Sequence, residues 1–213
     1  YECVFGDWSS DVCSSDLEAG FEGGKLAVFT GLNRGVEVFF ERALLTCRAD
    51  SPRRYEAQGW IDYNGGRYMD SAASFASAAA GYAALDPDAL PMNPNRAEML
   101  FLEALSYLRG GDFAKAAEKF GFLAQIPDLP WTAAANANAG IAWLKLNRLD
   151  TALEYLKSAS GSPGSTNAHP LYSLYMADIL FRFKRFDESL AVFRELENHP
   201  DAKDIEEETV RRS

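Results

Sequence analysis

Four residue positions recur together along the chain at a fixed spacing, and this repeat limits the possible folds more than any other sequence feature. Each copy begins with a small residue, followed nine places later by an apolar residue, three places on by a second small residue, and four places further by a large apolar residue. The four copies are Gly59, Tyr68, Ser71 and Phe75; Ala104, Phe113, Ala116 and Phe120; Gly140, Leu149, Ala152 and Leu156; and Ala177, Phe186, Ser189 and Phe193. Successive copies are 45, 36 and 37 residues apart at all four positions, which predicts repeated structural units rather than a catalytic motif.

Each copy predicts a pair of antiparallel helices. The best-defined copy contains the turn Gly110-Gly111-Asp112, in which two glycines allow a tight bend and the aspartate suits a helix N-cap. A small residue on the first helix lets the second helix approach closely, and the large apolar residue of the second helix fills the adjacent space. We therefore expect an all-α chain of packed helix pairs. An ordinary helical bundle with chance matches is the alternative.

From residue 52 to about residue 200 the pattern resembles the tetratricopeptide repeat, a helix-turn-helix unit of about 34 residues. The copy that begins near Ala97 fits best, whereas the copy that begins near Pro52 has Asp62 where an aromatic residue is typical. The residues in excess of this unit length are placed in Pro- and Gly-rich connections at residues 85–95, 126–131 and 161–170. The resemblance implies a right-handed superhelical solenoid of about four antiparallel helix pairs.

The segments that flank the repeats are expected to be less regular. Residues 17–51 are predicted to form a Gly-rich loop, with a short ordered run at residues 26–29, followed by one helix from about Asn33 that ends before Pro52. Residues 201–213 are predicted to begin a further helix, because acids come first and bases last. Either this helix caps the array or the chain is a fragment of a longer protein, and we favour the fragment.

Residues 1–16 are excluded from the fold prediction. The run from Gly6 to Leu17 resembles a translated sequencing adapter, so we expect a non-native, disordered leader. A genuine secreted leader in which Cys3 pairs with Cys13 is the alternative, although no signal peptide is visible. Without residues 1–16, which hold four acids and no base, the chain has 27 acids and 21 bases, a formal charge of −6. Cys47 is then the only cysteine, and we expect it to be a buried, inert thiol.

Composition and charge argue against two classes of partner. The whole chain has a net charge of −10 and no basic run longer than two residues, which disfavours binding to a nucleic acid. It also lacks the stretch of about 18 apolar residues that a membrane-spanning helix requires. We expect a cytoplasmic protein, or a periplasmic one if the native N-terminus carries a signal peptide.

The sequence offers no catalytic or metal-binding constellation. His169 and His199 each precede a proline in a predicted connection, and neither has Cys or His neighbours at metal-ligand spacing. The Gly-rich run at residues 20–25 lacks the glycine spacing, and the Ser or Thr, of a phosphate-binding loop. The acidic run at residues 206–208 fits a solvated helix face better than a metal site. We therefore expect a non-enzymatic protein without a cofactor or a metal.

The resemblance also implies where a partner would bind, because in this family the first helices line the concave side of the superhelix and contact peptides or helices of other proteins. In the register above, the groove-facing positions are Trp60, Tyr63, Asn64, Phe101, Leu102, Leu105, Arg109, Asn138, Ile141, Lys145, Leu174, Tyr175, Asp178 and Arg182. Their mixture of apolar residues with a few charges favours an amphipathic helix or an extended apolar peptide. The alternative is that several of them pack between neighbouring repeats.

The leading functional hypothesis is therefore a protein–protein interaction scaffold. A second hypothesis is that the chain is the helical repeat region of a larger enzyme or signalling protein. A third is a self-associating or envelope-assembly module.

Overall fold

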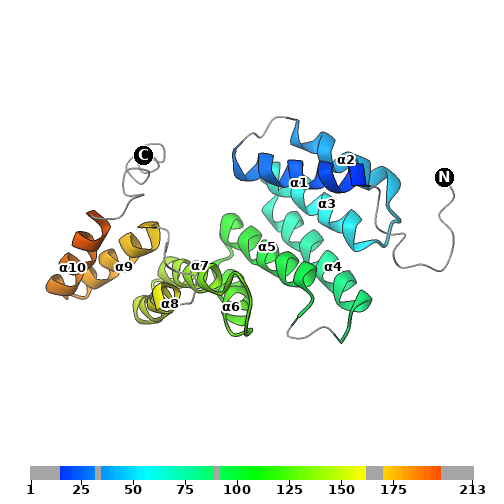
Figure 1. The fold of residues 1–213 in the computed structure, drawn as a ribbon. Helices are drawn as coiled ribbons and strands as arrows, with labels where there is room; N and C mark the ends of the chain where they lie inside the picture. Colours follow the sequence, from blue (N-terminus) through cyan, green and yellow to red (C-terminus); the bar gives the residue numbers. More distant parts are fainter. Residues whose placement is uncertain (1–14, 32–34, 89–91, 162–169, 198–213) are drawn as a thin grey trace. The chain divides into compact units, whose positions relative to one another are not determined.

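The computed structural model describes residues 15–31, 35–88, 92–161 and 170–197, and the structural statements below concern these ranges. They contain ten α-helices and no β-strand (Figure 1). The chain divides into two compact units, residues 1–112 and residues 113–213, and each unit is described by itself. Within each unit every helix packs against the next one in the sequence. The expected all-α helical repeat solenoid is confirmed.

The first unit contains α1 to α5. Their bounds are α1 Ser15–Phe29, α2 Val36–Thr46, α3 Pro52–Asn64, α4 Tyr68–Leu85 and α5 Pro94–Gly110. Both α3 and α5 begin at a proline, whose missing amide proton costs nothing in the first helical turn. The side chain of Asn93 caps α5 by accepting hydrogen bonds from the amides of Asn95 and Arg96.

The second unit contains α6 to α10. Their bounds are α6 Phe113–Ala124, α7 Thr132–Lys145, α8 Leu149–Gly161, α9 Pro170–Arg182 and α10 Phe186–Glu197. Each of the four predicted pairs therefore has a first helix and a second helix where the sequence pattern places them. Among the helices of the described ranges, none combines the length and the apolar character needed to cross a membrane.

One type of turn joins the two helices of each predicted pair. The residue seven places after the small anchor has a positive φ in all four turns, and its amide donates to the carbonyl three residues earlier. These residues are Gly66 (φ 74°), Gly111 (φ 84°), Asn147 (φ 59°) and Lys184 (φ 60°). The next amide donates to the carbonyl five residues back, which satisfies acceptors that the helix end would otherwise leave open. The shared turn explains why the spacing between small and apolar anchors is constant.

In two of the pairs, the small residue of the first helix directly contacts the large residue of the second helix. A Cβ atom added to Gly59 would lie 2.7 Å from ring carbons of Phe75, and one added to Gly140 would lie 2.7 Å from Cγ of Leu156. The second small residue also has a role, since the hydroxyl of Ser71 donates to the carbonyl of Gly59 at 2.9 Å. The hydroxyl of Ser189 makes the same 2.9 Å bond to Ala177.

The N-terminal helices form a fifth pair of the same kind. A Cβ atom added to Gly24 on α1 would lie 2.6 Å from Cζ of Phe40 on α2, and Phe40 follows Gly24 by sixteen residues, as Phe75 follows Gly59. Gly31 lies seven residues after Gly24, has φ 75°, and donates its amide to Val28 three residues earlier. This pair therefore repeats the small anchor, the large anchor and the positive-φ residue seven places after the small anchor.

The prediction of a loop at residues 17–32 is wrong, because α1 covers Ser15–Phe29. Glycines lower intrinsic helix propensity, which made the Gly-rich segment resemble a loop. Close packing against α2 outweighs this cost, since Gly23 lies against the ring of Phe39 and Gly24 against the ring of Phe40. The helix also begins two residues inside the excluded leader, whose residues 1–14 lie outside the described residues.

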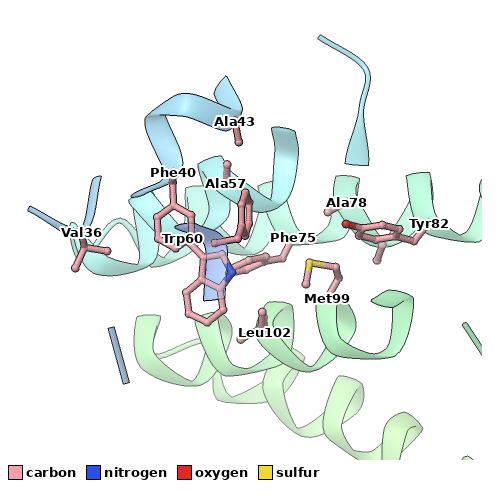
Figure 2. Packing of buried hydrophobic residues seen from close by; sticks show 12 residues of the cluster. Val36, Phe40, Ala43, Ala57, Trp60, Phe75, Ala78, Tyr82, Met99 and Leu102 are labelled. Carbon is pink, nitrogen blue, oxygen red and sulfur yellow. The ribbon is translucent and has the colours of Figure 1, made fainter. Parts of the chain in front are cut away.

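The core of the first unit is built around Trp60. Its side chain is fully buried between Phe40 and Phe75, with Met99 and Leu102 of α5 nearby (Figure 2). The Trp60 ring stacks on Phe40 at 6.2 Å between centroids and meets the Phe75 ring edge-on at 5.6 Å. In the second unit a smaller cluster includes Leu153, Leu156, Ile179 and Leu180. Helices α2 to α5 thus contribute to one continuous core in the first unit.

The close contact at Gly24 yields a matched pair of substitutions on one helix. Gly24→Ala should lower the free energy of unfolding by about 1 to 3 kcal/mol relative to Gly20→Ala, because the new methyl group clashes with Phe40. At Gly20 the nearest atom to an added Cβ is 3.8 Å away, so only the gain in helix propensity remains, about 1 kcal/mol at most. Urea unfolding followed by circular dichroism measures both values. Equal stability of the two variants would contradict the packing of α1 on α2.

Candidate functional site: the first-helix face

In each unit by itself, the first-helix face comprises polar and half-buried side chains on the first helices of the pairs. In the first unit these residues are Lys25, Arg53, Glu56, Tyr63, Asn64, Glu98, Phe101, Leu105 and Arg109. In the second unit they are Asn138, Ile141, Lys145, Leu174, Tyr175, Asp178 and Arg182. Most of them were predicted from the repeat pattern, and the structure shows which of them contact one another.

Two predicted partner-binding residues of the first unit belong to the core instead. Trp60 is fully buried and Leu102 is only 3% exposed, so neither side chain is available to a partner. Both pack where α3, α4 and α5 meet, as Figure 2 shows. For these two residues the alternative of packing between neighbouring repeats is correct, because the helix crossing is close enough to enclose them.

The remaining predicted residues of the first unit are accessible to different degrees. Tyr63 and Leu105 are half-buried and pack against the core cluster, and Phe101 is also half-buried. Asn64 is half-buried and donates a hydrogen bond to Glu37 of α2 at 3.4 Å. Arg109, near the C-terminal end of α5, is exposed. These residues combine apolar contact area with polar groups.

Tyr63 connects the last turns of α3 and α5. Burial is the main cause that raises the pKa of its hydroxyl, and the positive charge of Arg109, followed by a hydrogen bond with its guanidinium, partly offsets the increase. The Tyr63 ring also meets the ring of Tyr68, the first residue of α4, edge-on at 5.5 Å. The arrangement holds Arg109 next to an aromatic surface, where a guanidinium can orient a partner's carboxylate or carbonyl group.

At the other end of this face, Lys25 of α1 is surrounded by three carboxylates. Its Nζ lies 3.3 Å from Oε1 of Glu56 on α3, 3.0 Å from Oε1 of Glu98 on α5 and 3.2 Å from Oε1 of Glu22 on α1. The Lys25 side chain is 12% exposed and that of Glu56 is 2% exposed. A single ammonium group thus links the first helices of three successive pairs.

Glu56 has further partners that make its burial tolerable. Arg53 donates to its Oε2 at 3.0 Å, and the hydroxyl of Tyr82 donates to the same oxygen at 2.9 Å. The guanidinium of Arg53 also lies 4.2 Å above the centre of the Phe21 ring, a favourable cation–π distance. The residues Lys25, Glu22, Arg53, Glu56, Glu98 and Tyr82 are called the Lys25 network below.

Two members of the Lys25 network hold their protons more tightly than usual. Burial is the largest single effect on Lys25 and lowers its pKa, but Glu56, Glu98 and Glu22 together outweigh it, so the pKa of Lys25 rises well above its usual value. Burial, followed by the charge of Glu56, raises the pKa of the Tyr82 hydroxyl. Both groups therefore stay protonated at any physiological pH.

Sequence reasoning missed the Lys25 network, although one signal was present. Lys25 directly follows Gly24, the small anchor of the unrecognised fifth pair, and so corresponds to Trp60 in the next pair and Leu105 in the pair after it. Recognition of the fifth copy would have placed Lys25 on the first-helix face. The partner carboxylates could not have been chosen in advance, because Glu98 lies 73 residues away in the sequence.

The predicted residues of the second unit lie on α7 and α9. Ile141, Leu174 and Tyr175 are half-buried, and Tyr175 packs against the core cluster of this unit. Asn138 donates its side-chain amide to the carbonyl of Ala134, so its polar end is directed along its own helix. Lys145 is exposed, and Asp178 and Arg182 form an ion pair at 2.8 Å. These residues of the second unit are less enclosed than the Lys25 network.

The residues weighed as candidate catalytic, phosphate-binding or metal-binding groups lie only partly within the described ranges. Within those ranges, no group of three or more His, Cys, Asp or Glu side chains is arranged to hold a metal ion. His169, His199 and the acidic run at residues 206–208 lie outside the described residues. Residues 20–25 belong to helix α1, where their backbone amides are not available as a phosphate-binding loop. Cys47 is half-buried against the core of the first unit.

The enclosure of Lys25 predicts a large stability effect. Lys25→Met should lower the free energy of unfolding by on the order of 3 kcal/mol, because the buried Glu56 carboxylate loses a charged partner. Arg48→Met is the control, since the Arg48–Asp50 ion pair has the same 3.0 Å separation as Lys25–Glu98 but both side chains are more than 70% exposed. Exposed pairs contribute little. Equal effects of the two substitutions, measured by urea unfolding, would argue against a buried network.

The raised pKa values predict a loss of stability at alkaline pH. Lys25 and Tyr82 keep their protons more tightly in the folded state than in the unfolded state. Their contribution to the free energy of unfolding is therefore fully present below their unfolded pKa values of about 10, and it is lost as pH rises further. Tyr82→Phe should make this decline shallower, by up to about 1.4 kcal/mol per pH unit. Tyr55→Phe, at an exposed tyrosine, should leave the slope unchanged. Unfolding free energies measured from pH 8 to 11.5 test this, and identical slopes in all three proteins would contradict it.

Several solved structures of other proteins resemble the helical fold described above. The structure resembles the solved structure of Pseudomonas aeruginosa pilF, with a TM-score of 0.66 and 16% identity, over 84% of this chain and 74% of that one. It also resembles MamA from Desulfovibrio magneticus, with a TM-score of 0.61 and 12% identity, over 85% of this chain and 93% of that one. The TPR-like repeats of a Podosopora anserina protein described as a kinesin light chain give a TM-score of 0.64 and 14% identity, over 84% and 92% of the two chains. At these identities the likeness shows the fold alone.

The sequence itself identifies the family. No curated protein matches the chain significantly. The family model described as Tetratricopeptide repeat, however, matches residues 56–130 and 101–166, which together span more than half of the chain. Members of this family are protein–protein interaction scaffolds and are generally non-catalytic. The repeated anchors, the shared turns and this match lead to one conclusion: the chain belongs to the tetratricopeptide repeat family.

Proposed function

We propose that the chain binds a segment of a partner protein along its first-helix face. The observation that supports this most directly is the group Tyr63, Phe101, Leu105 and Arg109, in which half-buried apolar side chains adjoin an exposed guanidinium. Such a group gives a partner apolar surface to bury and one charge that sets its orientation.

The Lys25 network limits where a partner can bind in the first unit. Its carboxylates and ammonium group are already paired with one another, and Glu56 is almost fully buried. A partner that competed for these charges would have to break a buried ion pair at a large cost. The partner therefore contacts the other end of the face, at Tyr63, Asn64, Leu105 and Arg109.

The second unit offers a separate contact area on α7 and α9. Ile141, Leu174 and Tyr175 supply apolar surface, while Lys145 and the Asp178–Arg182 pair supply charge at its exposed edge. Alternation of apolar and charged groups suits an amphipathic helix or an extended peptide with apolar side chains more than a highly charged tail. The proposed ligand is thus a short, mainly apolar segment of another protein.

A photocrosslinking experiment tests the location of binding. The photoreactive amino acid p-benzoylphenylalanine is placed at position 105 on the proposed surface, or at position 45 on α2 as a control. Leu45 is 85% exposed, so that position reports nonspecific contact. We expect proteins in a cell extract that are labelled from position 105 and not from position 45. The same labelling from both positions would refute a specific surface on α5.

Affinity measurements with a protein captured in this way give the second test. Leu105→Ala should weaken binding roughly 5- to 30-fold, which corresponds to about 1 to 2 kcal/mol for a contact at the centre of an interface. Arg109→Glu, at an exposed position, should also weaken binding and leaves the core intact. Leu45→Ala is the matched control and should bind like the wild type. Isothermal titration calorimetry measures all four proteins, with thermal unfolding to verify that each is folded.

A further inference from the structure

Helix α10 of the second unit has an exposed apolar side. Phe186 is 54% exposed, Leu190 is 48% exposed and Phe193 is 40% exposed. These three residues lie at i, i+4 and i+7 of the helix and therefore share one side. Phe181 of α9, 60% exposed, extends this surface, since its ring meets that of Phe186 edge-on at 5.4 Å. These four side chains are called the α10 patch below.

The same side of another second helix is in contact with a helix. In α8 the residue that corresponds to Leu190 is Leu153, 6% exposed, and the residue that corresponds to Phe193 is Leu156, fully buried. Helix α8 packs on α9 and shares one core cluster with it. A helix is therefore an occupant that suits the α10 patch in size and shape.

Two opposite charges flank the α10 patch along one edge. Asp187 precedes Leu190 by three residues and Arg194 follows it by four, so both side chains are neighbours of Leu190 on the helix surface. Both residues are exposed, and the rise of an α-helix places them about 10 Å apart along the axis. This edge is thus negative toward the N-terminal end of the helix and positive toward the C-terminal end.

This order of charges fits a second copy of the same helix in the antiparallel orientation. A two-fold axis beside Leu190 brings the Leu190 side chains of the two copies together and places Asp187 of each copy opposite Arg194 of the other. In a parallel orientation the two Asp187 side chains would repel each other, as would the two Arg194 side chains, and the two helix dipoles would also oppose the contact. The α10 patch and its charged edge are therefore self-complementary in the antiparallel orientation.

We propose that the chain forms a homodimer in which α10 packs antiparallel against α10 of a second copy. Phe186, Leu190 and Phe193 of both copies form the apolar centre of the contact, and Asp187 and Arg194 form two identical ion pairs at its edge. The contact uses a second helix, so it is separate from the partner binding proposed at the first-helix face and does not rest on it. A helix of 12 residues offers less area than a standard interface. We therefore expect a weak dimer, with a Kd on the order of 10 to 100 μM.

Charge reversal tests the antiparallel pairing directly. Asp187→Arg sets two positive groups against each other at both ion pairs, and Arg194→Asp sets two negative groups against each other. Each variant alone should dimerise about tenfold more weakly than the wild type, or weaker still. An equimolar mixture of the two variants restores opposite charges at both ion pairs, and so does the double variant. The mixture and the double variant should therefore regain most of the affinity, which sedimentation velocity of the full chain measures over a concentration series.

A substitution in the α10 patch tests its apolar centre. Leu190→Asp should weaken dimerisation about tenfold or more, because the contact would bury a charge without a partner. Glu195→Lys is the control, since Glu195 is exposed and follows Phe186 by nine residues, which places it on the opposite side of α10. This control should dimerise like the wild type. Circular dichroism verifies that every variant is folded.

Three outcomes would overturn the proposal. A wild type that stays monomeric up to about 1 mM would leave the α10 patch to another segment of the same chain or to a different protein. A Leu190→Asp variant that dimerises as strongly as the wild type would place the dimer contact elsewhere. A mixture of the two charge-reversal variants that is no more dimeric than either variant alone would contradict the antiparallel pairing.

Discussion

Close contact between a small residue on one helix and a large apolar residue sixteen places later on the next is the interaction on which the rest of the structure depends. At Gly24, Gly59 and Gly140 a methyl group would already overlap with Phe40, Phe75 or Leu156. Dense packing of this kind gains many weak dispersion contacts and fixes where two helices cross. The connecting turn is constant as well. A residue with positive φ, seven places after the small residue, reverses the chain so that in the four predicted pairs the second helix begins at a constant number of residues after the small one.

The sequence predicted the architecture well where packing determines residue type. Anchors at Gly59, Ala104, Gly140 and Ala177 located four helix pairs, since only small residues fit at the crossings. Helix α1 was missed because the same requirement makes it rich in glycine, and glycine in isolation indicates a loop. The division of the chain at Asp112 and Phe113 was not foreseen either. The expected contact of Ala104 with Phe120 involves residues of different units and stays a prediction.

The candidate site was less predictable than the fold. Register alone selects helix positions, but the packing of the neighbouring helices decides whether a side chain on such a position is enclosed. Trp60 and Leu105 occupy the same position in successive pairs, yet Trp60 is fully buried and Leu105 is half-buried. The Lys25 network shows the same limitation, since it joins residues of α1, α3, α4 and α5 that share no local sequence pattern. Long-range contacts of this kind depend on the assembled structure.

The enclosure of Lys25 also has a chemical consequence. A lysine attacks an acyl group only through its uncharged amine, and three neighbouring carboxylates keep this amine protonated. Lys25 is therefore a poor nucleophile in the folded protein, and acetylating enzymes or amine-directed reagents would modify the exposed lysines, such as Lys145, Lys157 and Lys184, first. Modification at Lys25 would mark molecules in which α1 has separated from α3 and α5.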